Sequence, residues 1–330
     1  MAGTASRVEE CMAEGTELEA RLRAALGEKY VVQRELSNGG MATVFLVRDN
    51  AHDREVALKV LRPEVAKELG SHRFRHEIAV ASRLAHPNIL AIHDHGEAGG
   101  DLLWYTMPYV AGETLRQRMT RESQLPLGDA LRITREVASA LDYAHTAGYM
   151  HRDVKPDNIM VTATHDTLLA DFGIARPMRD ASGTPRAGTI MDVEVPTTTT
   201  GFVVGSPQYM SPEQVGGDPS IDGRSDQYSL GTVLFEMLAG ETPFGGRNAQ
   251  AVVAKMFAGA APSIRVVRPD VPITVDDAIV RALSRSRHDR FASISDFAAA
   301  LHIASSDARA GIGGAVSRLA TRLKAWRARA

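Results

Sequence analysis

The chain has 330 residues, a formal net charge of −2, and 44% hydrophobic and 24% charged residues. This balance predicts a soluble globular protein, and it excludes a general positive charge that would attract nucleic acid. The length predicts two lobes or domains, since single cores stop growing near roughly 250–300 residues. Cys11 is the only cysteine, so an internal disulfide framework and a cysteine zinc site are excluded and a reducing compartment is favoured.

The hydropathy pattern predicts a cytoplasmic chain. No apolar run reaches 18 residues, and the longest candidate, which begins at Tyr228, contains Glu236 and is predicted to be a buried helix. The first fifteen residues are acidic and lack the apolar core of a signal peptide.

The first third of the chain is predicted to contain mainly strands. Residues 1–28 form a preceding segment whose apolar side chains recur at loosely helical spacing, which predicts an exposed or peripherally docked helix. Short segments rich in β-branched residues follow and predict antiparallel strands at 30–36, 43–49 and 54–61. A helix is then expected around 72–85, with two further strands at 90–97 and 102–110.

After Gly112 the pattern becomes mostly helical. The clearest amphipathic run covers 127–148 and ends at Gly148, the usual position for a helix stop. Residues 176–205 lack any period and are rich in Pro, Gly, Ser and Thr, which is typical of a functional or mobile insert. The order of elements predicts an α+β protein with two lobes and a cleft between them.

Three motifs carry the chemistry: "HRDVKPDN" at 151–158, "DFG" at 171–173, and "VALKVL" around Lys59. Together they resemble the signature of protein kinases, specifically the bacterial eukaryotic-like (Hanks-type) serine/threonine kinases. The resemblance covers about residues 30–302. It implies an antiparallel-sheet N-lobe with one helix at about 30–107 and a mainly helical C-lobe at about 111–302, with a helical extension at 1–28 and a basic tail at 303–330.

The resemblance assigns a task in phosphoryl transfer to each charged residue. Asp153 is expected to accept the proton of the substrate hydroxyl, and Lys155 to contact the γ-phosphate. Lys59 is expected to hold the α- and β-phosphates while Glu77 fixes its rotamer. The alternative for Glu77 is an ordinary exposed charge on a helix.

Two further residues are candidate metal ligands. Asn158 and Asp171 offer the oxygen atoms that Mg²⁺ prefers, with ATP phosphates completing the shell and Mn²⁺ as the alternative ion. The alternative interpretation is that both are plain turn residues.

Several residues are expected to support the site without touching substrate. Asp226 resembles the helix acid that braces the backbone of the catalytic loop, and His151 is expected to be a packed core histidine. Glu213, in "SPE", and Arg290 are expected to form a buried architectural pair, although Arg287 stands where the family often has proline.

The ATP site is expected to combine a glycine-rich loop with the hinge around Met107. In the family pattern G-x-G-G-M-G-x-V, Ser37 and Ala42 replace two glycines. A negative φ at both positions would make the steric cost small, whereas a positive φ would cost around 1 kcal/mol or more. A weakened loop is expected to raise the KM for ATP, not to abolish transfer. The expected nucleotide-binding residues are Leu36, Ser37, Asn38, Gly39, Gly40, Met41, Val44, Ala57, Lys59, Met107, Pro108, Val110 and Met160.

Regulation is expected in the activation segment. Arg152, before Asp153, marks the class whose segment is ordered by phosphorylation. Thr198 and Thr200, within "TTTT", fall where related bacterial kinases autophosphorylate, and the alternative is a flexible polar loop. Ser206 is expected to hydrogen-bond Asp153 and Lys155.

The tail at 303–330 has the pattern of a basic amphipathic helix. Such a helix lies on an anionic membrane, which would place the chain at the inner face of that membrane, or docks a partner. The alternative is a helix packed on the kinase or left solvated. Dimerisation through the N-lobe is implied by the resemblance alone.

The sequence therefore predicts a serine/threonine protein kinase. It would transfer the γ-phosphate of ATP to hydroxyls of protein substrates, including its own activation segment. The main alternative is a nucleotide-binding pseudokinase that serves as a signalling scaffold. A third hypothesis is a phosphotransferase of similar fold that acts on small molecules.

Overall fold

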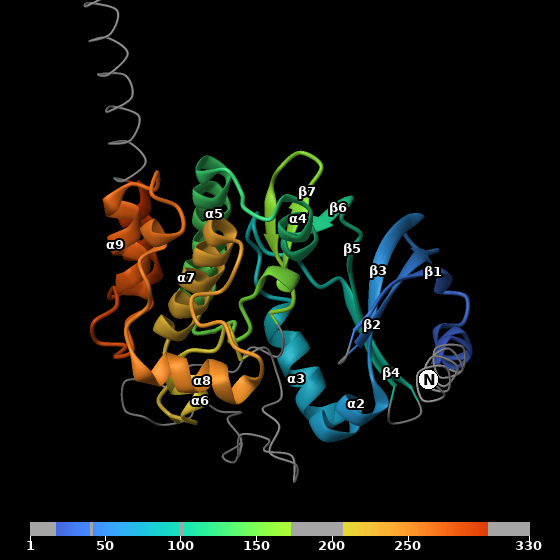
Figure 1. Ribbon diagram of the computed structural model, residues 1–330. Coiled ribbons are helices and arrows are strands. Elements are labelled where there is room, and N and C mark those ends of the chain that lie inside the picture. The colour runs from blue at the N-terminus through green and yellow to red at the C-terminus, as the bar shows by residue number, and fades with distance from the viewer. Residues whose placement is uncertain (1–17, 40–41, 99–101, 173–206, 303–330) are drawn as a thin grey trace, which may run out of the picture. The chain divides into compact units, whose positions relative to one another are not determined.

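The computed structural model describes residues 18–39, 42–98, 102–172 and 207–302. The chain divides into two compact units, one formed by residues 1–85 and 90–111 and the other by residues 86–89 and 112–330. The first contains an antiparallel sheet with short helices and the second is mainly helical (Figure 1). The predicted α+β class is confirmed.

The first unit is built on a five-stranded antiparallel sheet with the order β1-β2-β3-β5-β4. The third strand has the predicted bounds. The fourth starts four residues later than predicted, at Asp94, which pairs with Thr106. The strands are β1 (Tyr30–Asn38), β2 (Ala42–Asp49), β3 (Arg54–Leu61), β4 (Asp94–Ala98) and β5 (Leu102–Pro108).

Both faces of this sheet are covered by apolar side chains. On one face Leu22 and Leu26, from the helical residues 18–26, are buried against a cluster that contains Phe45 and Leu58. The described part of the N-terminal segment, from residue 18 on, therefore docks on the sheet, as one of its two predicted arrangements required, and residues 1–17 lie outside the described residues. The other face carries a second cluster, to which helix α3 (Ser71–Ala81) contributes Phe74 and Ile78.

A short helix that the sequence analysis did not predict, α2 (Pro63–Leu69), precedes α3. Pro63 occupies its first turn, where the missing N–H costs nothing, and Gly70 ends it at φ 75°. This glycine, with its positive φ, separates α2 from α3, the helix that the sequence analysis predicted around 72–85.

The second unit contains two long helices, α5 and α7. α5 (Leu127–Thr146) ends before Gly148, which has φ 87°, so the predicted stop is confirmed. α7 (Arg224–Ala239) is buried along nearly its whole length, as predicted for the apolar run at Tyr228. The other elements are β6 (Gly112–Thr114), α4 (Leu115–Glu122), η1 (Pro156–Asn158), β7 (Ile159–Thr162), β8 (Thr167–Leu169), α6 (Pro212–Val215), α8 (Ala249–Ala258), η2 (Ile264–Val266) and α9 (Ile273–Ala282).

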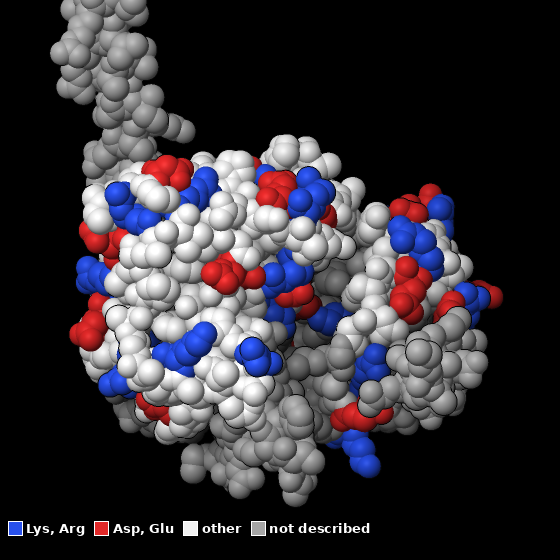
Figure 2. All heavy atoms as spheres, viewed as in Figure 1, with Lys and Arg blue, Asp and Glu red and all other residues white. Residues whose placement is uncertain are grey.

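Charged side chains of both signs are interspersed on the face of each unit shown in Figure 2. Across the described residues, none of the helices combines the length and the apolar character needed to cross a bilayer.

Candidate active site

The predicted catalytic residues of the second unit lie together on one loop. Lys155 donates from Nζ to Asp153 Oδ2 at 2.6 Å. Asn158 donates from Nδ2 to the same carboxylate oxygen at 3.0 Å and to the Asp153 carbonyl oxygen at 2.8 Å. The carboxylate is therefore fixed by a cation and an amide while its residue stays half-buried. Charge-assisted bonds of this kind hold a side chain in one orientation.

His151 packs in the core beneath this loop. Its Nδ1 accepts the N–H of Asp153 at 3.2 Å, and its Nε2 contacts the Ala170 carbonyl oxygen at 3.0 Å. These two contacts fit the tautomer with hydrogen on Nε2, and both ring nitrogens then have partners. The prediction of a packed histidine is confirmed, since the residue is fully buried.

Asp226 on α7 braces the same loop from below. Its carboxylate accepts the backbone N–H of His151 at 2.8 Å and that of Arg152 at 2.7 Å. This confirms the bracing contact predicted from the sequence. Arg152 has φ 64°, a conformation uncommon for a residue other than glycine, so the brace holds a backbone that would otherwise relax.

The sequence analysis missed the side-chain partner of this aspartate. His145, in the last turn of α5, lies with Nε2 2.7 Å from Asp226 Oδ2. Gly223 lies so close to this imidazole that a Cβ there would come within 2.6 Å of Nδ1. Nothing in the local pattern around His145 distinguishes it from an ordinary helix-end histidine.

A buried ion pair fixes the segment that follows the loop. Arg290 donates to both carboxylate oxygens of Glu213, at 2.6 and 2.8 Å, so the predicted architectural pair is confirmed. Ser211 caps α6 by accepting the N–H of Gln214, whose side chain donates to the Arg152 carbonyl oxygen at 2.9 Å. The α6 segment and the catalytic loop are thereby tied together, and the sequence analysis did not predict this Gln214 contact.

The two candidate metal ligands fit a divalent cation chemically. The N–H of Ala170 donates to the Asn158 carbonyl oxygen at 2.8 Å, which brings the neighbouring Asp171 beside Asn158. Since the amide nitrogen of Asn158 is bonded to Asp153, its amide oxygen is the atom left for a cation. Within the described ranges, no group of three or more His, Cys, Asp or Glu forms a complete metal site.

In the first unit, the strand register places four predicted nucleotide contacts on one face of the sheet. Val44 pairs with Lys59, and Ala57 pairs with Met107. Because side chains two residues apart share a face, Ala57 and Lys59 point the same way. Lys59 Nζ lies 5.9 Å from the centre of the Tyr105 ring, and Glu77 is buried on α3, which covers this face.

The start of the glycine-rich loop is tightly held. Arg62 donates to the Asn38 side chain and to the Gly39 carbonyl oxygen, both at 2.9 Å, and the Gly39 N–H donates to the Ala42 carbonyl oxygen. Neither Ser37 nor Ala42 has a positive φ. Ala42 is buried in the cluster that contains Leu61 and Phe74. The two replacements therefore carry no backbone strain.

Four further predicted nucleotide contacts lie within the described residues. Leu36 belongs to β1, Pro108 ends β5, and Val110 is half-buried next to the division between the units. Met160, on β7, pairs with Thr114 in the second unit. Outside the described residues lie Gly40, Met41, Thr198, Thr200, Ser206 and the tail at 303–330.

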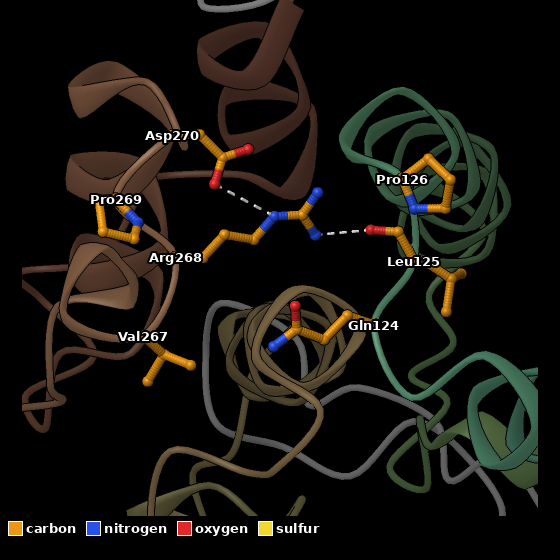
Figure 3. Close-up of a pocket in the computed structure, with 7 residues that line it drawn as sticks. All are labelled: Gln124, Leu125, Pro126, Val267, Arg268, Pro269 and Asp270. Atoms are coloured by element: carbon orange, nitrogen blue, oxygen red, sulfur yellow. Dashed lines mark hydrogen bonds and ion pairs between the residues drawn. The ribbon is translucent and has the colours of Figure 1, made fainter.

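A separate pocket of about 430 Å³ opens where the α4–α5 connection meets residues 267–270. Arg268 crosses it, paired with Asp270 at 3.5 Å and donating to the Leu125 carbonyl oxygen at 2.6 Å (Figure 3). None of its lining residues was predicted to act in catalysis.

Comparison with known proteins defines the class. The model of the protein kinase domain family matches residues 30–309. The serine/threonine-protein kinase PknB of Mycobacterium leprae is 38% identical over 282 residues, which is 84% of this chain and 43% of that protein. The serine/threonine-protein kinase PrkC of Bacillus subtilis is 36% identical over 82% of this chain and 40% of its own length. The chain spans about half the length of the curated relatives it matches, or somewhat less.

A solved structure supports the same class. The crystal structure of the Mycobacterium tuberculosis PknI kinase domain superimposes with a TM-score of 0.65 at 35% identity. The match covers 84% of this chain and 96% of the PknI chain. This chain belongs to the protein kinase domain family, in its bacterial eukaryotic-like branch. Protein kinases as a family use ATP, a divalent metal ion and protein substrates.

Proposed function

We propose that this chain is a serine/threonine protein kinase that transfers the γ-phosphate of ATP to serine and threonine hydroxyls of proteins. The supporting observation is the fixed carboxylate of Asp153, which is bonded to Lys155 and Asn158 on a loop braced by Asp226. The pseudokinase alternative rested on a glycine-rich loop weakened by Ser37 and Ala42. Neither residue has a positive φ, so no backbone strain in the described residues favours that alternative.

The residues divide the work of the reaction. Asp153 accepts the proton of the substrate hydroxyl and aligns its oxygen for attack. Lys155, held 2.6 Å from Asp153, offsets the charge of the transferred phosphoryl group. Lys59 holds the α- and β-phosphates, and Glu77 orients Lys59. The burial of Glu77 on the helix that covers the Lys59 face supports this pairing.

The divalent ion is proposed to be Mg²⁺, with Mn²⁺ the alternative. Asn158 and Asp171 would hold it, since both supply the hard oxygen ligands that Mg²⁺ requires. When bound, it would offset the negative charge of the β- and γ-phosphates. This chain's own contribution is to keep Asn158 and Asp171 adjacent through the Ala170–Asn158 backbone bond.

The activation segment is the proposed regulatory element. Arg152 is half-buried on the braced loop itself, and its guanidinium would bond a phosphate on Thr198 or Thr200 in a bidentate manner. Mass spectrometry of the purified protein and of Asp153→Asn tests this. We expect phosphate on that threonine run in wild type only, and equal phosphate on both proteins would contradict autophosphorylation.

Location and assembly complete the proposal. A cytoplasmic site of action, at or near the inner face of the membrane, fits the use of ATP and the basic pattern of the tail at 303–330. A dimer through the first unit is proposed from the family alone. Co-sedimentation with anionic liposomes, comparing the full chain with a 303–330 deletion, tests the membrane contact, and unchanged binding after deletion would remove it.

Phosphoamino-acid analysis tests the proposed activity. With labelled ATP, Mg²⁺ and a generic basic protein, we expect label on serine and threonine and none on tyrosine. Lys59→Met should remove the label because it deletes the phosphate contact, whereas Lys67→Met, at an exposed position of α2, should not. Label that persists in Lys59→Met would show that another enzyme in the preparation is responsible.

A further inference from the structure

Arg116, on α4, lies in a cluster of charged and phenolic groups that the catalytic assignment does not use. Its Nη1 donates to Glu236 Oε1 at 2.8 Å, and its Nη2 donates to the Tyr209 hydroxyl. Its Nε lies 3.6 Å from Asp157 Oδ2. One guanidinium is therefore shared among three residues from α7, η1 and the segment before α6.

The hydroxyl of Tyr209 completes this arrangement. It accepts from Arg116 and donates to Glu236 Oε2 at 2.6 Å, so both oxygens of Glu236 have donors. Burial and the neighbouring Glu236 carboxylate raise the pKa of Tyr209, which keeps its proton in place for this bond. The Arg116 guanidinium carbon also lies 5.9 Å from the centre of the Tyr209 ring, within cation–π distance.

Carboxylates outnumber cations within this cluster. Glu236 has only 9% of its side chain exposed, whereas the side chain of Asp157 is 52% exposed and that of Arg116 is 33% exposed. Two carboxylates and an aromatic face surround a single guanidinium. Without Arg116, the same groups would form a site for a cation, and Glu236 would be a buried carboxylate in need of one.

The cluster adjoins the catalytic loop on two sides. Asp157 immediately precedes Asn158, which holds the Asp153 carboxylate. Tyr209 immediately precedes the segment in which Gln214 bonds the Arg152 carbonyl oxygen. Both neighbours in the chain thus bond the loop that carries Asp153, which places the cluster next to that loop.

We propose that Arg116 is a specificity-determining residue, because it fills from within the chain a cation site beside Asp153 and so denies that site to arginine or lysine side chains of the substrate. The inference rests on the proposed kinase activity. It predicts that a basic residue near the acceptor does not raise the kcat/KM of the wild type. Removing Arg116 should open a site that binds such a residue and raises kcat/KM. The substrate class of the wild type is thus one without a required basic residue.

Peptide phosphorylation tests this directly. The probes are peptides with one acceptor threonine in an alanine-rich background and a single arginine moved through the positions on either side. With Arg116→Ala, we expect kcat/KM to rise roughly tenfold for arginine at one or two positions relative to alanine there, the value of a charge-assisted hydrogen bond. Wild type and Arg116→Lys should show no such preference, since both keep a cation in the site.

The matched control is Arg121→Ala, on the same helix. Arg121 pairs with Glu113 and Glu122, outside the cluster, so its removal should leave the positional profile of the wild type unchanged. Arg116→Gln serves as a second neutral variant with a hydrogen-bonding side chain, should the alanine variant unfold. A flat profile in a folded neutral variant would overturn the inference.

Binding separates this inference from the activity itself. Fluorescence anisotropy with the labelled arginine and alanine peptides needs no phosphate transfer. Tighter binding of the arginine peptide by Arg116→Ala than by wild type would support the cation site even if no peptide were phosphorylated, in which case only the proposed function fails. Equal binding of both peptides by both proteins would contradict the cation site.

Discussion

The carboxylate of Asp226 accepts the backbone N–H of Arg152 at 2.7 Å, and Arg152 immediately precedes Asp153. The same aspartate accepts from His151 and contacts His145, so one buried side chain joins α7, the end of α5 and the catalytic loop. Because Arg152 has a left-handed backbone, the loop depends on this bond for its shape.

Replacement of Asp226 by asparagine tests the dependence. Both carboxylate oxygens of Asp226 face donors, whereas asparagine has only one oxygen that can accept. Its NH₂ group would face the backbone N–H of the loop or His145, and at least one of these bonds would be lost. We expect phosphoryl transfer to fall by about tenfold to a hundredfold, and the free energy of unfolding to fall by roughly 2–4 kcal/mol.

Asp276→Asn is the matched control for that variant. Asp276 is also a buried helix aspartate, but it accepts from Ser263 and from the Ile264 N–H, far along the chain from the loop. We expect lower stability with kcat unchanged. Equal losses of kcat in both variants would show that Asp226 acts on catalysis only through general stability.

The stability that Asp226 contributes should depend on pH. Burial alone would raise the pKa of this carboxyl, but the hydrogen bond and charge of His145 and the backbone donors outweigh it and hold the pKa below its usual value. A depressed folded-state pKa gives stability that is present above the unfolded value of about 4 and lost as the pH falls through the folded value. The difference in unfolding free energy between wild type and Asp226→Asn should therefore shrink below about pH 4. A difference that stays constant down to strongly acidic pH would contradict the assignment.

The Glu213–Arg290 pair should be costly to break. Arg290 is fully buried and Glu213 nearly so, so Arg290→Met leaves an uncompensated carboxylate in the core. We expect a loss of about 3–5 kcal/mol in urea unfolding. The surface pair Arg23–Glu19, with side chains 57% and 34% exposed, is the comparison. Arg23→Met should cost less than about 1 kcal/mol. Similar losses of stability in both variants would show that burial does not set the cost of breaking the Glu213–Arg290 pair.

Restoring glycines to the loop should not improve the enzyme. Ala42 is buried against Leu61 and Phe74 with a negative φ, so Ala42→Gly removes core contacts and adds chain entropy. We expect a loss of about 1 kcal/mol in stability and little change in the KM for ATP. Ser37→Gly, at an exposed strand position, should leave both nearly unchanged. A marked fall in KM for either variant would show that the side chains obstruct the nucleotide.

Strand positions and the chemical motifs could be predicted because they are local. The strand-type segment REVALKVL, which follows the turn residues before Arg54, defines β3 to the residue, and Gly148 stops α5 through its own backbone freedom. The contacts of Asp226 with the loop and of Arg290 with Glu213 could be predicted only through the family resemblance, since 74 and 77 residues separate the partners.

Other contacts had no signal in the sequence. His145 meets Asp226 only because α5 and α7 pack together, and periodicity records no partner across 81 residues. The short helix α2 was not predicted, and a hydrophobic period does not reveal that it ends at Gly70 with a positive φ. The cluster of Arg116 with Tyr209 and Glu236 likewise arises from tertiary packing of three elements.

The most direct test is single-turnover phosphoryl transfer from ATP, with Mg²⁺, by wild type and Asp153→Asn. Asp153 is held by Lys155 and Asn158, and asparagine cannot accept the substrate's proton. We expect the rate to fall by at least roughly a hundredfold, with Asp166→Asn, in an exposed turn, unchanged. Equal rates for wild type and Asp153→Asn, or no transfer by either protein, would contradict the catalytic role assigned to this site.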